Sequence, residues 1–209
     1  TPVSTYIKVR DLFAQSALME SSDYHGSENN RSFIGLEPLA SFSVSHGKAV
    51  MVYPDKSIHK EKITDTYTVA DAFEQFIEMF HVEGADSSYC GLYGYTAFNA
   101  VRYFENIAIK DSKESCNDAP DIHYILYKYL LVFNDFSSEL KLLEMIADGE
   151  ASQSEHIASA VMSRNYATYA FHAIGDTTSP LTDEEHKANI RRGIAHCKRG
   201  DVFQIVLSR

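Results

Sequence analysis

The chain has 209 residues, of which 44% are hydrophobic and 12% aromatic, so it is long enough to bury a core as one large domain or two small ones. A formal net charge of −10 without a basic patch argues against nucleic acid as a partner. A small-molecule or protein partner fits this charge better than nucleic acid does. The sequence contains no run of about eighteen apolar residues, so no membrane span is predicted. Three cysteines without CxxC spacing predict neither a disulfide framework nor a zinc site and favour a reducing, cytoplasmic setting.

In the first half of the chain, short apolar stretches bounded by Gly, Pro and polar residues predict strands. A short helix is predicted first, at 3–13. Strands are predicted at 17–20, 32–36, 40–44, 49–53 and 89–98. Thr68 and Asp71 stand three residues apart before an apolar helical face, which is the pattern of an N-terminal capping box. The segment "GLYGY" lacks the spacing and the Lys of a phosphate loop, so its glycines are interpreted as structural.

The second half continues with strands and two further helices. Strand patterns occupy 121–135, which fits one or two strands, and also 139–146 and 166–172. Capping boxes at 152–155 and 182–185 predict two helices, and Gly200 predicts the end of the second. The last segment, 202–207, is apolar on nearly both faces, as strands in the middle of a covered sheet are. Strands dominate and helices are interspersed, so the predicted class is α+β.

Two places carry candidate binding chemistry. Glu20 and Ser21 end a predicted strand, and Arg31 closes the polar stretch that follows. There Glu20 would pair with the ammonium of an amino acid, Arg31 with its carboxylate and Ser21 with either. The alternative is a solvated turn with an exposed ion pair. Gln204 interrupts the apolar segment 202–207, and a buried amide must either satisfy its hydrogen bonds or face a cleft. The alternative for Gln204 is the exposed edge of a sheet.

Five segments, in chain order, resemble the large subunit (component I) of anthranilate synthases, within the chorismate-utilising enzyme family. They are "TPVSTYIKVRDLF", "LMESSDYHGSENNRSFIGLEP", "GLYGYTAFNAVRYFE", "PDIHYILYKYLLVFND" and "LTDEEHKANIRRGIAHCKRGDVFQIVLSR". The resemblance covers residues 1–209. It implies the N-terminal part of a chain that continues for about as many residues again, with about 180–209 as the start of the chorismate-binding catalytic region. The fold implied is the family's β-sandwich with outer helices, here incomplete.

The resemblance also implies an activity. Anthranilate synthases convert chorismate and ammonia to anthranilate and pyruvate, and a separate glutamine amidotransferase subunit supplies the ammonia. Mg²⁺ holds the chorismate carboxylate, and L-tryptophan inhibits from a distant site. The magnesium ligands and the catalytic His of the family lie past Arg209, so no metal site is expected within these residues and the fragment is expected to be inactive alone.

Four residues match functional positions of the family. Glu20 and Ser21 match the Glu-Ser of the tryptophan site, and Arg31 stands where the family has a basic residue, often Lys. Gln204 matches the Gln of a Phe-Gln-Val-Val segment in the active-site strand, where relatives that add water to chorismate carry Lys. Two alternatives stay open: the large subunit of aminodeoxychorismate synthase, which serves folate synthesis, and a non-catalytic amino-acid-binding module.

Overall fold

The computed structural model describes residues 1–21, 30–84, 86–109, 118–134 and 136–209. The two predicted polar loops, at 21–31 and 110–119, therefore fall mostly outside the described residues. Contacts divide the chain into two compact units, Thr1–Ala167 and Thr168–Arg209, and each is described by itself. Within the described residues, no helix is long and apolar enough to cross a membrane.

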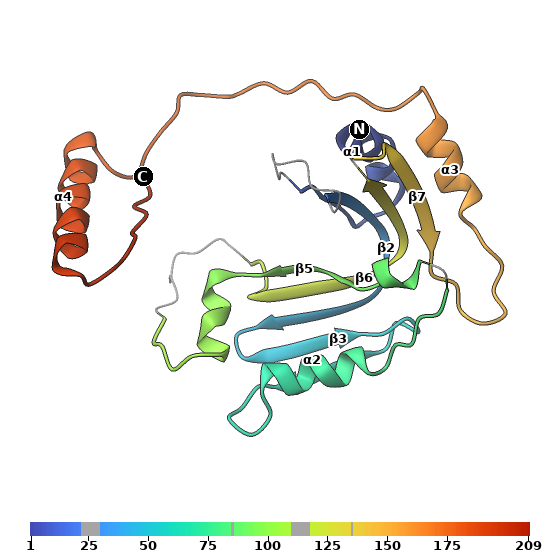
Figure 1. The fold of residues 1–209 in the computed structure, drawn as a ribbon, viewed down its shortest axis with the longest axis horizontal. Coiled ribbons are helices and arrows are strands. Elements are labelled where there is room, and N and C mark those ends of the chain that lie inside the picture. Colours follow the sequence, from blue (N-terminus) through green and yellow to red (C-terminus); the bar gives the residue numbers. More distant parts are fainter. Residues whose placement is uncertain (22–29, 85, 110–117, 135) are drawn as a thin grey trace. The chain divides into compact units, whose positions relative to one another are not determined.

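The first unit is built on one antiparallel sheet, to which the described residues contribute seven strands (Figure 1). The strands are β1 (Ser16–Met19), β2 (Arg31–Ser45), β3 (Lys48–Val52), β4 (Ile58–Lys62), β5 (Leu92–Thr96), β6 (Ile122–Asn134) and β7 (Glu139–Glu144). Their order is β4-β3-β2-β6-β5, with β1 also paired to β2 and β7 also paired to β6. This antiparallel sheet with accompanying helices confirms the predicted α+β class.

The long strands β2 and β6 form the centre of the sheet and differ in one respect from the prediction. Two strands were expected around Pro38, but β2 runs through it as one strand with a shift of register between Pro38 and Ala40. Proline has no backbone N–H to donate, and an irregularity in the ladder accommodates that loss without ending the strand. The stretch 121–135, which fitted one strand or two, forms the single strand β6.

Helices cover the sheet and create two apolar clusters. The α-helices are α1 (Pro2–Val9), α2 (Val69–Ile77) and α3 (Glu155–Met162), and the short 3-10 helices are Arg10–Leu12, Ser87–Tyr89 and Phe98–Tyr103. Phe76 of α2 packs in the first cluster with Phe42 of β2. Val9 of α1 and Ile157 of α3 pack in the second with Tyr129 of β6. The apolar face predicted for α2 is thus the face that meets the sheet.

The capping boxes test how far local sequence decides where helices begin. At α2 the Thr68 side chain accepts a hydrogen bond from the Asp71 N–H, and Asp71 in turn accepts from the Thr68 N–H, as predicted. The box predicted at 152–155 is wrong. Helix α3 has Ser154 at its N-cap without a side-chain bond, because Ser152 donates its hydroxyl to Glu144 Oε2 on β7 at 2.5 Å. A carboxylate eight residues earlier in the chain, at the end of β7, competes with the helix end for that hydroxyl.

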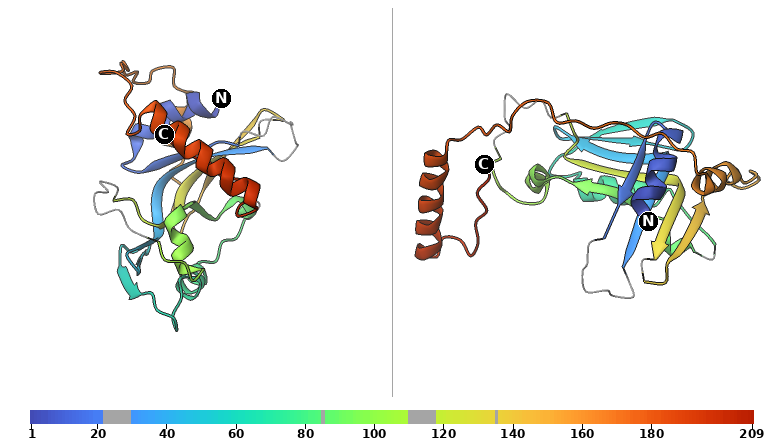
Figure 2. Two further views of the ribbon diagram at one scale, coloured as in Figure 1. Left: turned by 90° about the vertical axis from the view of Figure 1, so that its left-hand side faces the viewer. Right: turned by 90° about the horizontal axis from the view of Figure 1, so that it is seen from above.

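The second unit contains α4 (Asp183–Arg199), which Figure 2 shows as a continuous helix followed by chain without regular structure. Thr182 and Glu185 form the predicted capping box, and Gly200 ends the helix in the left-handed conformation at φ +79°. The strands predicted at 166–172 and 202–207 are wrong, since neither segment forms a strand. A strand needs a neighbour to bond its backbone, and within the second unit no other described segment is a strand.

Candidate functional site

The three residues predicted to bind an amino acid lie at one end of the β1–β2 pair. Glu20 and Ser21 follow the last residue of β1, and Arg31 is the first residue of β2. Of the residues that join them, 22–29 lie outside the described ones. The antiparallel pairing of β1 with β2 explains why positions ten residues apart come to the same end of the sheet.

The register of this pair sorts the three side chains by face. Met19 of β1 pairs with Phe33 of β2. Continuing that register by two residues would place Ser21 across from Arg31, and successive side chains of a strand point to opposite faces. On this extrapolation the Ser21 hydroxyl and the Arg31 guanidinium share a face, and Glu20 belongs to the other. Ser21 and Arg31 are then the pair suited to a single carboxylate.

The three residues also differ in how firmly they are held. Arg31 is partly buried, its backbone pairs with Asn134 of β6, and its guanidinium donates from Nη1 to the Asn30 carbonyl at 3.1 Å. Glu20 and Ser21 are exposed. The site thus has a partly buried cation at the end of the central strands β2 and β6, with a hydroxyl and a carboxylate at the surface. These are the groups that recognise the two charged ends of an amino acid.

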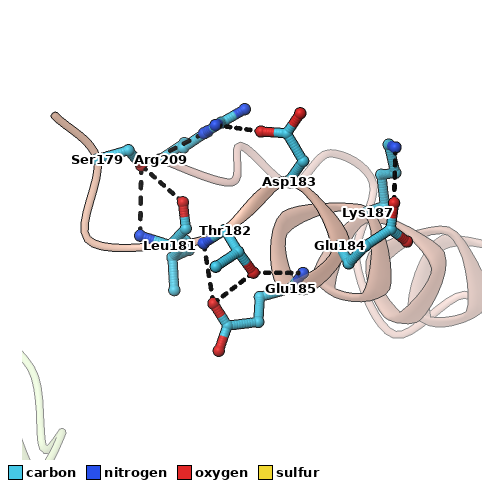
Figure 3. Close-up of polar contacts among 8 residues, drawn as sticks. All are labelled: Ser179, Leu181, Thr182, Asp183, Glu184, Glu185, Lys187 and Arg209. Atoms are coloured by element: carbon cyan, nitrogen blue, oxygen red, sulfur yellow. Dashed lines mark hydrogen bonds and ion pairs between the residues drawn. The ribbon is translucent and has the colours of Figure 1, made fainter. Parts of the chain in front are cut away.

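Gln204 lies in the second unit, exposed, in the segment that does not form a strand. That segment is tied back to the start of α4 by Arg209, as Figure 3 shows. Arg209 donates from Nε to Ser179 Oγ at 3.3 Å and forms an ion pair with Asp183. Within this unit Gln204 is therefore exposed and outside any strand, and its place in an active-site strand stays a prediction.

The ends of α4 carry charges that complement the helix dipole. Three acidic residues occupy its first turn and three basic ones its last turn. Hydrogen bonds from the Thr182 backbone and hydroxyl hold the pKa of Glu185 below its ordinary value (Figure 3). At the other end, hydrogen bonds from Arg199 and His196 lower the pKa of Asp201. These groups stabilise the helix and give no sign of binding chemistry.

The part of the chain that the structure describes holds no cluster of metal-binding side chains, and its two cysteines are not paired. No group of three or more His, Cys, Asp or Glu side chains there is placed to hold a metal ion. Cys90 and Cys197 are free thiols, and Cys116 lies outside the described residues. Gly94 of the "GLYGY" segment supports the structural interpretation of that segment, because a Cβ at Gly94 would lie 1.8 Å from the His123 carbonyl oxygen.

Comparison with known proteins gives a consistent result. The profile of a family described as chorismate binding enzyme matches residues 15–209. The chain is 25% identical over 241 residues to anthranilate synthase alpha subunit 1, chloroplastic, of Oryza sativa subsp. indica. It is 23% identical over 226 residues to anthranilate synthase component 1 of Lactococcus lactis subsp. lactis. Both alignments cover 100% of this chain, but only 41% and 46% of the relatives.

A solved structure supports the fold. The chain superimposes on anthranilate synthase component I from Streptococcus pneumoniae TIGR4 with a TM-score of 0.53 at 14% sequence identity. The match covers 96% of this chain and 44% of that one. The chain therefore spans less than half the length of the relatives that it matches.

Proposed function

Because this chain belongs to the chorismate-binding enzymes, we propose that it is part of the large subunit of an anthranilate synthase. The observation that carries the proposal is the alignment of the whole chain with anthranilate synthase subunits of rice, Arabidopsis thaliana and Lactococcus lactis. The proposed reaction converts chorismate and ammonia to anthranilate and pyruvate, the first step of tryptophan biosynthesis. A glutamine amidotransferase subunit is the proposed source of ammonia, and the proposed setting is cytoplasmic.

We assign feedback inhibition by tryptophan to the end of the β1–β2 pair. Arg31 and Ser21 would bind the carboxylate of tryptophan through charge-assisted hydrogen bonds. Glu20 would pair with its ammonium from beyond the end of β1, where the strand pairing has stopped at Met19 and the backbone is no longer held to the alternation of faces. The partly buried guanidinium of Arg31 supports this assignment, because a cation anchored in the sheet loses little conformational freedom on binding. Inhibition from such a site would be a coupling free energy between two sites of the subunit.

Gln204 is the proposed contribution of this chain to the reaction centre. An amide side chain donates and accepts hydrogen bonds but takes up no proton at neutral pH, so it orients a nucleophile without acting as a base. That suits ammonia, which attacks without losing a proton first, better than water, which needs a base. Mg²⁺, when bound, would neutralise substrate carboxylate charge. The described residues do not form a site for it, so no step is assigned to the metal here.

The test follows anthranilate fluorescence from chorismate, magnesium and ammonium, using the full-length protein that contains this chain. Anthranilate should form, and tryptophan should slow its formation. Ser21→Phe should raise the tryptophan concentration needed for half inhibition by about tenfold or more, because the new ring fills the place of the ligand. Ser159→Phe, at an exposed serine of α3, is the matched control and should be inhibited like the wild type.

Each outcome has a distinct meaning. Anthranilate with unchanged inhibition in Ser21→Phe would keep the reaction and refute the inhibitor site. Aminodeoxychorismate in place of anthranilate would move the protein to folate synthesis. Tryptophan binding without either product would favour the non-catalytic amino-acid-binding module.

A further inference from the structure

A hollow of about 560 Å³ lies within the first unit, where α1 and the residues leading into β1 meet the β5–β6 pair. Its volume is typical of small-molecule sites. None of Glu20, Ser21 or Arg31 lines it. Met19, which precedes Glu20, does line it, so the hollow adjoins the proposed inhibitor site without sharing its three residues. An inference about the hollow does not depend on the proposed reaction.

The walls of the hollow are rich in aromatic rings, and two of these rings are firmly placed. Tyr127 is 3% exposed, and its ring occupies the space that a Cβ at Gly35 would need, 2.3 Å away. Tyr93 donates its hydroxyl to the Tyr89 carbonyl at 2.5 Å, and its ring centroid lies 5.3 Å from that of Phe33. Rings that are already ordered lose little entropy when a planar ligand packs against them.

The charge in the hollow is opposite to that of the chain as a whole. The chain carries a formal net charge of −10, yet Arg10 is the only formally charged residue among the described lining residues. Asp11 lies 3.7 Å from Arg10 Nε, and its side chain is 57% exposed. A guanidinium has five N–H donors in a planar fork, so it accommodates a carboxylate beside an existing partner.

A histidine supplies a further polar group. His123 of β6 lines the hollow, and its Nδ1 atom is buried without a hydrogen-bond partner among the described residues. Burial lowers the pKa of this imidazole, so at neutral pH it is uncharged, with one donor and one acceptor. A buried polar atom without a partner costs free energy, which a hydrogen-bonding ligand would recover.

We propose that this hollow binds a small planar aromatic carboxylate, with the carboxylate on Arg10 and the ring against Tyr93, Tyr95 and Tyr127. Two properties of the ligand are required together. The aromatic walls select a flat ring over a puckered one, and the single cation in an acidic protein selects an anion over a neutral isostere.

The probe for this site is benzoate, titrated into the full chain and followed by backbone amide NMR. Saturable binding is expected, with shifts concentrated at the residues that line the hollow. Benzamide removes the negative charge, and cyclohexanecarboxylate removes the flat ring. Each should bind at least about tenfold more weakly, the effect of losing one charge-assisted hydrogen bond or one well-packed ring contact.

Two variants assign the contacts. Arg10→Gln should weaken benzoate binding by about tenfold and leave benzamide binding unchanged. Arg164→Gln, at an exposed arginine outside the lining, is the matched control and should bind benzoate like the wild type. Tyr95→Leu, at an exposed position of β5, should weaken benzoate binding but not cyclohexanecarboxylate binding. Absence of saturable binding, shifts outside the hollow, or equal affinity for benzoate in Arg10→Gln would overturn the proposal.

Discussion

The two units of this chain respond differently to the same kinds of sequence signal. In Thr1–Ala167, helices begin and end near the predicted positions and the strands find partners, so that Phe42, Phe76 and Tyr129 are fully buried. In Thr168–Arg209, the helix forms as predicted but the strand does not. Local signals operate in both units, whereas a strand requires a neighbouring strand, and the second unit offers none among its described residues.

The two units also differ in how much apolar surface they bury, because the second unit leaves large apolar side chains exposed. Helix α4 presents Ile190 and Ile194 at 39% and 49% exposure, and Phe203 beyond it is fully exposed. Of the residues of α4, only Gly193 is buried. Burial of apolar surface is the main favourable term in folding, so the first unit should hold most of the stability of the chain. The predictions below test this contrast, in order of expected effect.

The largest effect is expected for Phe76→Ala. Phe76 of α2 is fully buried, and its ring centroid lies 5.1 Å from that of Phe80 and 5.8 Å from that of Phe42. Losing the ring should lower the free energy of unfolding by about 3–5 kcal/mol in urea denaturation. Phe203→Ala in the second unit should change it by less than about 0.5 kcal/mol. Equal losses in the two variants would contradict the contrast.

A steric test follows at Gly94 of β5. A Cβ there would lie 1.8 Å from the His123 carbonyl oxygen and 2.7 Å from Tyr124 Cα, so Gly94→Ala must push β5 away from β6. A loss of about 1–3 kcal/mol in the free energy of unfolding is expected. At Gly91, by contrast, a Cβ would meet no heavy atom within 4 Å. If Gly91→Ala were as destabilising as Gly94→Ala, the described pairing of β5 with β6 would be wrong.

Thr68→Ala tests a capping box that forms. It removes the oxygen that accepts from the Asp71 N–H, and the expected loss is about 1 kcal/mol in the free energy of unfolding. Ser154→Ala at the start of α3 should cost much less, because Ser154 makes no side-chain capping bond there and its hydroxyl meets only that of Ser152, at an exposed contact of 3.0 Å. Urea denaturation of both variants distinguishes a cap that is made from one that the sequence only suggests.

Thr182→Ala removes the equivalent bond, from the Glu185 N–H, in the second unit. Because α4 buries so little, this change should appear as faster amide hydrogen exchange in the first turn of α4 and leave the unfolding of the first unit unchanged. A fall in global stability like that of Thr68→Ala would mean that the two units unfold together, and the contrast would fail.

The smallest expected effect concerns pH. Burial lowers the pKa of His123 below its ordinary 6.5, so the unfolded chain binds the proton more readily than the folded one. Stability from this group is fully present above the unfolded pKa and is lost as the pH falls from there through the lower, folded pKa. The urea midpoint should therefore fall less between about pH 7.5 and 5.5 in His123→Gln than in the wild type. An identical fall would show that His123 contributes nothing.

The features predicted correctly from the sequence are those that depend on interactions between residues a few positions apart. The boxes at Thr68 and Thr182 and the stop at Gly200 depend on a side chain or a backbone angle close by. The errors involve contacts made with another element of the fold. Glu144 of β7 takes the hydroxyl of Ser152, and β4, with the sequence "IHKEK", is a strand because it pairs with β3 and not because its residues alternate.

The two sites likewise have features that the sequence predicts and features that only the structure shows. The sequence places Glu20 and Ser21 at a strand end and Arg31 at the close of the polar stretch that follows, but the pairing of Met19 with Phe33, which sorts them by face, comes only from the structure. The hollow was missed altogether. Its lining residues come from segments between Tyr6 and Tyr127 with no fixed spacing, and a glycine at 35 that makes room for a ring at 127 has no signature in the sequence.

The most direct test of the proposed function is the identity of the product. The full-length protein would be incubated with chorismate, magnesium and ¹⁵N-labelled ammonium, and the products would be separated and identified by mass spectrometry. The account predicts anthranilate carrying one ¹⁵N atom, with an equal amount of pyruvate. Labelled aminodeoxychorismate without pyruvate, or a product with oxygen in place of nitrogen, would contradict it.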